Sequence, residues 1–270
     1  MHTNNSRTWA EAYHIRFTNL EEAEGQVLAM KDLEDDAKLL SILSRFAESI
    51  QSPALQVTGS LFLKRYGLLI AGALHGFIRQ RDAIDLSRDN ITMVWKEPAL
   101  KFLVKNAEEP AFLRGMRDDR ERRARFFDHL FAEQAVPMLH RLAQVTGIRE
   151  HTLWGTLSYS IAYWKKHWLQ SGGISSEERL RVEDDFNELY GCAGGSRFPG
   201  KEANPLARDF RAVDNPWEES DPVLVRSDCC LYYCLPGKKE GHCYTCPKIS
   251  DDNRLNKYAL THGYSMSGGK

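Results

Sequence analysis

The sequence predicts a mainly α protein of the α+β class, with a helical body, a small β-hairpin and a C-terminal cysteine-rich segment. Apolar residues recur at helical spacing through most of residues 34–190. A short run rich in β-branched residues, 91–95, follows a cluster of turn residues. Five of the six cysteines fall between Cys229 and Cys246. At 270 residues, the chain can form one large or two modest domains. We expect a body over residues 1–200 and the cysteine-rich segment over 201–270.

The first half of the chain shows two apolar stretches with a helical pattern. Residues 34–50 place one apolar stripe on a single helix face, formed by Leu39, Leu40, Leu43 and Phe46. Ser52 and Pro53 resemble an N-cap followed by proline in the first turn. The next apolar stretch, 54–78, is interrupted at Lys64-Arg65 and Gly67. It favours two buried helices that separate near Gly67.

A β-hairpin is expected between the early and late helices. Residues 85–90 read Asp-Leu-Ser-Arg-Asp-Asn, which is typical of a turn. Residues 91–95 are typical of a strand, and Ala83-Ile84 are the candidate hairpin partner.

Three further helices are expected before residue 191. Apolar positions recur between residues 118 and 145, where Pro137 should kink or divide the helix and Gly147 should end it. A helix over about 150–169 carries Trp154, Trp164 and Trp168, which we interpret as core residues. Ser175 or Ser176 with Glu178 predicts the cap of a helix that runs to about Tyr190. Glycine- and proline-rich loops follow, and the boundary between body and cysteine-rich segment should lie between about 191 and 225.

Composition excludes several classes of function. The net charge of −1 gives no global attraction to nucleic acid. No run approaches ~20 consecutive apolar residues, so we expect no transmembrane segment, although peripheral contact with a membrane stays open. The first residues lack the basic and apolar regions of a signal peptide, so we expect a cytoplasmic protein. In a reducing compartment, clustered cysteines indicate metal ligands or redox groups.

The cysteine spacing predicts a thiolate metal site. Thiolates are soft ligands, and four of them suit zinc or an iron–sulfur cluster. Cys243 and Cys246 have the Cys-x-x-Cys spacing of structural zinc sites. Adjacent Cys229 and Cys230 suit a single small ion less well, because neighbouring side chains tend to point apart. Spacing alone therefore leaves zinc and iron–sulfur open.

The run from Arg226 to Pro247 resembles the C-terminal signature of the FhuF-like ferric siderophore reductases. The likeness includes both cysteine pairs and the Leu-Tyr-Tyr-x-Leu-Pro-Gly stretch between them. It extends more diffusely upstream, to 52–76, 83–87 and 153–155, and similar helical domains occur in siderophore synthetases of the aerobactin type. The resemblance implies a [2Fe–2S] cluster, held here by Cys229, Cys230, Cys243 and Cys246. It also implies one-electron reduction of siderophore-bound Fe(III), with a siderophore-binding body over 1–200.

Two features depart from the family pattern. The gap between the cysteine pairs is twelve residues rather than ten, and Cys234 stands where the family usually has a basic residue. Cys234 could therefore replace Cys229 or Cys230 as a ligand, although we favour the four matched cysteines. His242 adjoins Cys243 and is a further candidate ligand, as histidine is in Rieske centres. Cys192 is interpreted as a partly buried free thiol.

Candidate partners follow from the same resemblance. The substrate would be a ferric siderophore of the hydroxamate or citrate type. No nucleotide-binding motif occurs, so electrons should come from a donor protein or a diffusible reductant. The candidate substrate-binding residues are Arg226, Tyr233, Lys165, Lys166, Lys238 and Lys239. The alternative is a non-enzymatic protein that binds a siderophore or a partner and has a structural Cys₄ zinc site.

Overall fold

The computed structural model describes residues 7–17, 25–96, 99–192, 194–237 and 241–264. Most of these residues are helical, which confirms the predicted fold class. The α-helices are α1 (Asp36–Ser49), α2 (Leu55–Ile78), α3 (Asp119–Asp128), α4 (Val136–Thr146), α5 (Glu150–Gln170), α6 (Ser176–Gly191) and α7 (Asp251–His262).

Helix α2 is a single continuous helix, so the predicted break near Gly67 is wrong. A Cβ atom at Gly67 would meet α5 side chains at an ordinary contact distance of 3.6 Å. Gly67 therefore lies at a helix-packing face, where tertiary contacts outweigh its low helix propensity. By length and composition α2 could cross a membrane, but 78% of the qualifying stretch is buried inside the protein. A buried core helix passes the same test.

Helices α3 and α4 are joined by a π-helical stretch, His129–Ala135. Pro137 lies in the first turn of α4, where its missing N–H is tolerated. The predicted division of this helix by proline thus takes the form of a π-helical insertion. Gly147 ends α4 with a φ of 70°, as predicted.

The strands form a four-stranded sheet of order β1-β4-β3-β2. Its members are β1 (Ile15–Phe17), β2 (Gln26–Ala29), β3 (Ile91–Lys96) and β4 (Ala99–Val104). The hairpin partner of β3 is β4, with Ile91 opposite Val104, so the prediction of Ala83-Ile84 as partner is wrong. These two residues are buried in a loop before the turn, where their apolar side chains join the core instead of a sheet.

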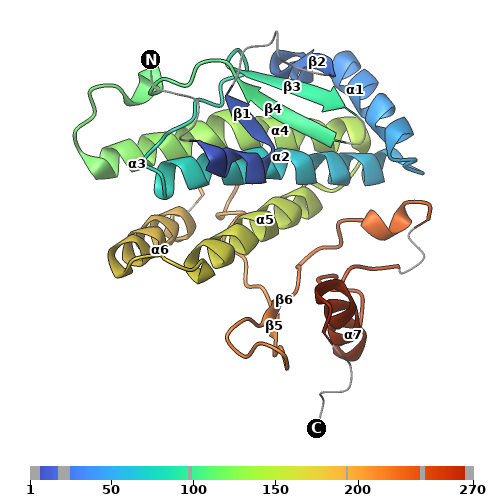
Figure 1. Ribbon diagram of the computed structural model, residues 1–270. Helices are drawn as coiled ribbons and strands as arrows, with labels where there is room; N and C mark the ends of the chain where they lie inside the picture. The colour runs from blue at the N-terminus through green and yellow to red at the C-terminus, as the bar shows by residue number, and fades with distance from the viewer. Residues whose placement is uncertain (1–6, 18–24, 97–98, 193, 238–240, 265–270) are drawn as a thin grey trace.

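The elements stack in layers (Figure 1). The sheet and α1 cover one face of α2 and α4, and α5 and α6 lie against the opposite side. At Gly72 of α2 an added Cβ would come within 2.5 Å of Ile15, so glycine allows the helix to approach β1 closely. Trp154 and Trp168 are buried in the core, as predicted.

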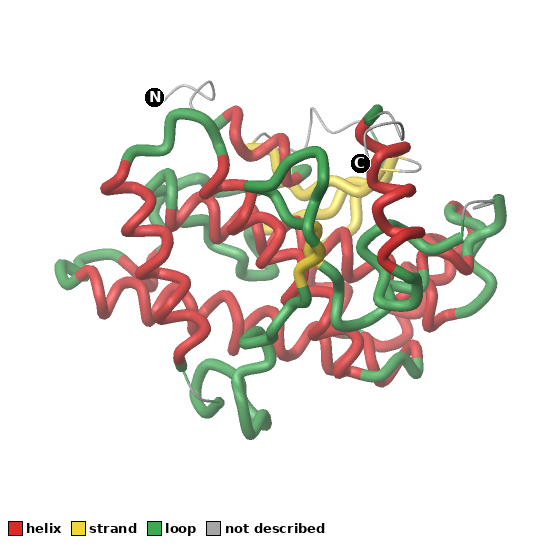
Figure 2. The backbone as a smooth tube through the Cα atoms, turned by 90° about the horizontal axis from the view of Figure 1, so that it is seen from below, coloured by secondary structure: helices red, strands yellow, loops and turns green. Residues whose placement is uncertain are grey.

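The C-terminal part of the chain runs across the outer side of α5. It contains the two-stranded pair β5 (Ala212–Val213) and β6 (Val223–Leu224), a short 3-10 turn (Tyr232–Cys234) and α7. Figure 2, viewed from below, shows the long loops on both sides of these short strands. The division at residue 200 stays a prediction.

Candidate metal centre and adjoining cavity

The first cysteine pair is fixed to the helical body by the residue before it, Asp228. Its carboxylate accepts hydrogen bonds from Arg208 at 3.0 Å and from Ser227 at 2.9 Å. The carboxylate also lies directly against Gly155 of α5, where a Cβ atom would collide with it. Gly155 therefore gives the cysteine-rich segment room to approach α5.

A second anchor ties the same pair to α2. The buried hydroxyl of Ser60 donates a hydrogen bond to the carbonyl of Cys230 at 3.0 Å. Leu231 then adopts a left-handed conformation with a φ of 60°. This turn directs the backbone N–H groups of Leu231 and Tyr232 to the sulfurs of Cys229 and Cys230 respectively. Such N–H···S bonds stabilise thiolates and tune the potential of iron–sulfur clusters.

The second cysteine pair is held by α7. Cys243 and Cys246 are linked by a tight turn, in which the Cys246 N–H donates to the Cys243 carbonyl at 3.0 Å. Arg254 of α7 is fully buried, and its guanidinium donates to the carbonyls of Tyr244, Cys246 and Ile249. Because one planar group binds three carbonyls of the turn, α7 fixes the orientation of this cysteine pair.

The four family-matched thiols meet as two cross pairs, each with one member from either end of the segment. The sulfurs of Cys229 and Cys246 lie 3.6 Å apart. Cys230 and Cys243 are hydrogen-bonded through their side chains. Cys230 and Cys246 are buried, whereas the other two are partly exposed, and all four are free thiols. The fold thus brings Cys229 next to Cys246, and Cys230 next to Cys243, across a twelve-residue loop.

The charges and the hydrogen bond around the Cys230–Cys243 pair favour the thiolate form of Cys230. The hydrogen bond from Cys243, aided by the charges of Lys64 and Arg226, lowers the pKa of Cys230 to about 4. The same shared hydrogen bond, together with burial, raises the pKa of Cys243 above its usual range. Burial, with a smaller contribution from Cys246, raises the pKa of Cys229 to about 12. Without a cation the four sulfurs cannot all be ionised, so the pocket suits a positively charged metal centre.

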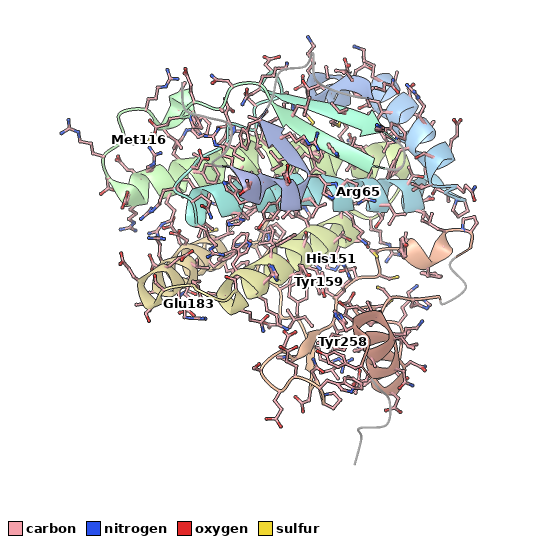
Figure 3. The ribbon with its side chains drawn as sticks, viewed as in Figure 1. Arg65, Met116, His151, Tyr159, Glu183 and Tyr258 are labelled. Carbon is pink, nitrogen blue, oxygen red and sulfur yellow. The ribbon has the colours of Figure 1, made fainter. Side chains whose placement is uncertain are left out.

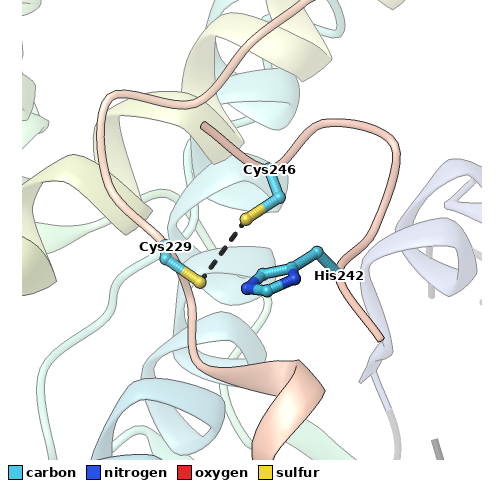
Figure 4. A group of neighbouring side chains, drawn as sticks. All are labelled: Cys229, His242 and Cys246. Atoms are coloured by element: carbon cyan, nitrogen blue, oxygen red, sulfur yellow. Dashed lines mark hydrogen bonds between the residues drawn. The ribbon is translucent and has the colours of Figure 1, made fainter. Parts of the chain in front are cut away.

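His242 lies beside the thiols. One of its ring nitrogens and the sulfurs of Cys229 and Cys246 all lie within 4.8 Å of one another (Figure 4). The Nε2 atom is buried without a hydrogen-bond partner among the described residues. The ring stacks on Tyr233 with centroids 4.1 Å apart, so Tyr233 contacts the histidine and does not line the large cavity described below.

Cys234 and Cys192 stand apart from the converged thiols. Cys234 lies in the 3-10 turn after the first pair and packs against the apolar core. Cys192 is at the end of α6, where it accepts a hydrogen bond from Asn204 at 3.3 Å. Among the described residues, the one group placed to hold a metal ion is Cys229, His242 and Cys246. Cys192 and Cys234 lie outside it, and so do Cys230 and Cys243.

A cavity of about 470 Å³ opens directly beside the thiols. Cys230 and Cys243 form part of its wall, whereas Cys229 and Cys246 do not. The remaining wall comes from α1, α2, α5 and the cysteine-rich segment, and includes several aromatic rings: Phe46, Tyr159, Tyr163, Trp164, Tyr232 and Tyr244. A pocket of this size and composition is typical of a small-molecule site.

Three cations line this cavity, and sequence reasoning identified one of them. Arg226 donates to the Thr245 hydroxyl at 3.1 Å, and its guanidinium lies 4.0 Å from the centre of the Tyr159 ring. Lys64 and Arg65 of α2 were missed as site residues. The available signal was their position, because a pair of basic residues interrupts an otherwise buried helix. Figure 3 shows Arg65 on α2 and Tyr159 on α5.

The structure does not bring the other predicted lysines to this cavity. Lys165 points to α6, where its ammonium lies 5.0 Å from the Phe186 ring centre, and burial lowers its pKa. Lys166 forms an ion pair with Asp221 and lines a smaller neighbouring cleft. Lys238 and Lys239 lie outside the described residues. Trp164, interpreted as core, is half-buried and lines the cavity.

The donor set fits a thiolate-bound iron–sulfur cluster. Four cysteine thiolates are the ligands of most [2Fe–2S] centres, and here four thiols lie as two pairs, with N–H donors to two of the sulfurs. The same residues also suit zinc, either as Cys₄ or with His242 as a ligand.

Comparison with known families bears on the body rather than on the cysteines. Residues 60–215 match the family model described as "Ferric iron reductase FhuF-like transporter". The chain belongs to this family. The matched region ends before Cys229, so the family assignment and the converged cysteines are separate observations. The family's description implies an oxidoreductase that acts on ferric iron. Comparison with curated proteins gives no match.

Proposed function

We propose that this FhuF-family protein is a cytoplasmic ferric siderophore reductase with a [2Fe–2S] cluster on Cys229, Cys230, Cys243 and Cys246. The observation that carries the proposal is the pairing of these thiols beside a small-molecule cavity, with Cys230 and Cys243 in its wall, in a chain of a ferric reductase family. Such a cluster, when bound, supplies one electron at a time.

The chain's own residues would perform three tasks in this reaction. The aromatic and cationic wall of the cavity binds the chelate next to Cys230 and Cys243. Ser60, Asp228 and Arg254 hold the two cysteine pairs in a fixed orientation. The partly buried position of the thiols limits access of water and oxygen.

The redox balance requires an external donor. An electron-transfer protein or a diffusible reductant provides one electron, and chelated Fe(III) takes it up to become Fe(II). Siderophores hold Fe(III) through hard oxygen ligands, which bind the softer Fe(II) less tightly. Reduction therefore releases iron, and no covalent bond to the protein has to form or break.

Composition and colour test this proposal. Protein purified without oxygen should be red-brown and contain about two irons and about two acid-labile sulfides per chain. After reduction it should convert a ferric siderophore to Fe(II), detected with a coloured Fe(II) chelator. Colourless protein with one zinc and no sulfide, from both aerobic and anaerobic preparations, would contradict it.

The second candidate is a structural zinc site in a protein that binds a siderophore without reducing it. The specific observation in its favour is His242, whose ring lies within 4.8 Å of two cysteine sulfurs. Cysteine and histidine together are typical zinc ligands. Replacement of His242 would lower the affinity of a zinc site that uses this histidine but leave a four-cysteine cluster in place. A Cys₄ zinc site is separated from the cluster by its lack of colour.

A further inference from the structure

The cavity beside Cys230 and Cys243 is lined by an excess of positively charged side chains. Lys64, Arg65 and Arg226 line it, and none of the described residues in its wall carries a carboxylate. Lys64 and Arg65 form no ion pair with a carboxylate of the described part of the chain, and both are half-buried. Half-buried cations in a cavity without acidic neighbours attract an anion.

Two of these three cations act on the cysteine sulfurs. Lys64 and Arg226 both act electrostatically on Cys230, and Arg226 also acts on Cys243. These two cations therefore offset the negative charge of the sulfurs, whatever else the cavity binds. They do not by themselves indicate a charged ligand.

Arg65 differs from its two neighbours. It lines the same cavity, and it forms no hydrogen bond or ion pair with a side chain of the described part of the chain. It also has no cation–π contact with the described aromatic rings, whereas Lys64 lies 5.3 Å from the centre of the Tyr232 ring. A guanidinium on a helix, turned to a cavity and without a protein partner, is suited to bind ligand oxygens through two parallel hydrogen bonds.

We propose that the cavity selects ferric chelates of net negative charge, and that Arg65 is the residue that recognises this charge. The inference rests on the proposed function for the identity of the ligand as a ferric chelate. It adds a preference, within that class, for anionic citrate-type chelates over neutral or cationic trihydroxamates. The chelate's organic shell would contact the aromatic wall, including Tyr163, which is 46% exposed.

Binding of redox-inactive gallium chelates tests this preference. Ga(III) has the charge of Fe(III) and similar coordination, but reduced protein does not convert it to a divalent ion. The cluster-loaded protein is titrated by calorimetry with an anionic Ga(III) chelate of a citrate-type siderophore and with a Ga(III) trihydroxamate that carries a free ammonium group. We expect the anionic chelate to bind at least about tenfold more tightly.

Variants at Arg65 assign the effect to one residue. Arg65→Gln should weaken binding of the anionic chelate by about tenfold, the loss expected for one charge-assisted contact. Binding of the cationic chelate should stay the same or tighten. Arg65→Lys should retain most of the affinity, and Arg120→Gln, on the distant helix α3, should change nothing. Iron content and the midpoint potential should match the parent protein in all three variants.

The outcomes separate this inference from the proposed function. Equal affinity for both chelates, or an unchanged preference in Arg65→Gln, overturns the inference even if the protein reduces Fe(III). A lowered potential or lost iron in Arg65→Gln also overturns it, because Arg65 would then act on the cluster. Charge-selective gallium binding without reduction of any ferric siderophore, of either charge, supports the inference and refutes the reductase.

Discussion

The helical body and the cysteine-rich segment are stabilised in different ways. In the body, apolar side chains from α1 to α6 and the sheet form one continuous core, whose last fully buried member is Leu206. The segment beyond it has a few apolar contacts with this core, such as those of Leu231 and Leu235, and polar anchors at Ser60, Asp228 and Arg254. A core of this size folds through hydrophobic burial, whereas the proposed cluster, when bound, would add metal–thiolate bonds to the segment. Because the body has its own core, we expect it to stay folded when the cluster is lost.

Removal of a family-matched thiol should have the largest effect. Cys230→Ser and Cys246→Ser should abolish the visible absorption of the cluster, because each leaves iron without a ligand. The helical circular dichroism and the melting of the body should change little. Cys234→Ser and Cys192→Ser are the matched controls and should keep full iron content. A bleached Cys234 variant beside a normally coloured Cys230 variant would reverse the ligand assignment.

Replacement of Arg254 should come next. Arg254→Met leaves three carbonyls of the turn, one of them in a fully buried hydrogen bond, without their donor, a loss of about 3 kcal/mol in the stability of the segment. Hydrogen exchange should speed up in α7 and in the turn at 243–246, with no change in α2 or α5. Arg254→Lys should recover part of the effect, because it keeps the charge but not the planar fork. Equal protection in the Met variant would show that the segment does not depend on this contact.

Two glycine-to-alanine variants compare the contact with α5 at two points. At Gly155 the new methyl group collides with Asp228, so Gly155→Ala should destabilise the segment by about 2 kcal/mol and lower iron occupancy. At Gly67 the nearest atoms lie 3.6 Å away, and Gly67→Ala should stabilise α2 by up to about 1 kcal/mol. Denaturation curves and iron content of both variants check this. If both variants change the stability and the iron content alike, Gly155 has no special role in the contact between α5 and the segment.

The smallest expected effect is a pH dependence of the stability of the body, which arises from His75. Burial, aided by the nearby charge of Arg79, lowers the pKa of His75 to about 4, so the ring is neutral at pH 7. An unfolded chain binds this proton near pH 6.5, so stability falls as the pH drops from about 6.5 towards 4. Between about pH 7 and pH 5.5 the loss should be about 1 kcal/mol. His75→Gln should remove this part of the pH dependence, and an equally steep profile in that variant would contradict it.

The sequence predicted helices well, because helical periodicity is a local property. It failed at Gly67, where packing against α5 keeps one helix continuous, and at Ala83-Ile84, whose burial in a loop depends on distant elements. The cysteine spacing predicted a metal site but could not show which thiols pair, since that pairing crosses a twelve-residue loop. Lys64 and Arg65 were visible as an interruption of α2. Their place at the cavity follows from tertiary structure alone.

The most direct test of the central claim is a single-turnover measurement without oxygen. The protein is reduced chemically, freed of excess reductant and mixed with an excess of a ferric siderophore in the presence of a coloured Fe(II) chelator. The account predicts that about one Fe(II) appears per reduced cluster, at the same rate at which the visible spectrum returns to its oxidised form. A reduced spectrum that persists in the presence of every ferric siderophore tried, with no Fe(II) formed, would contradict the account.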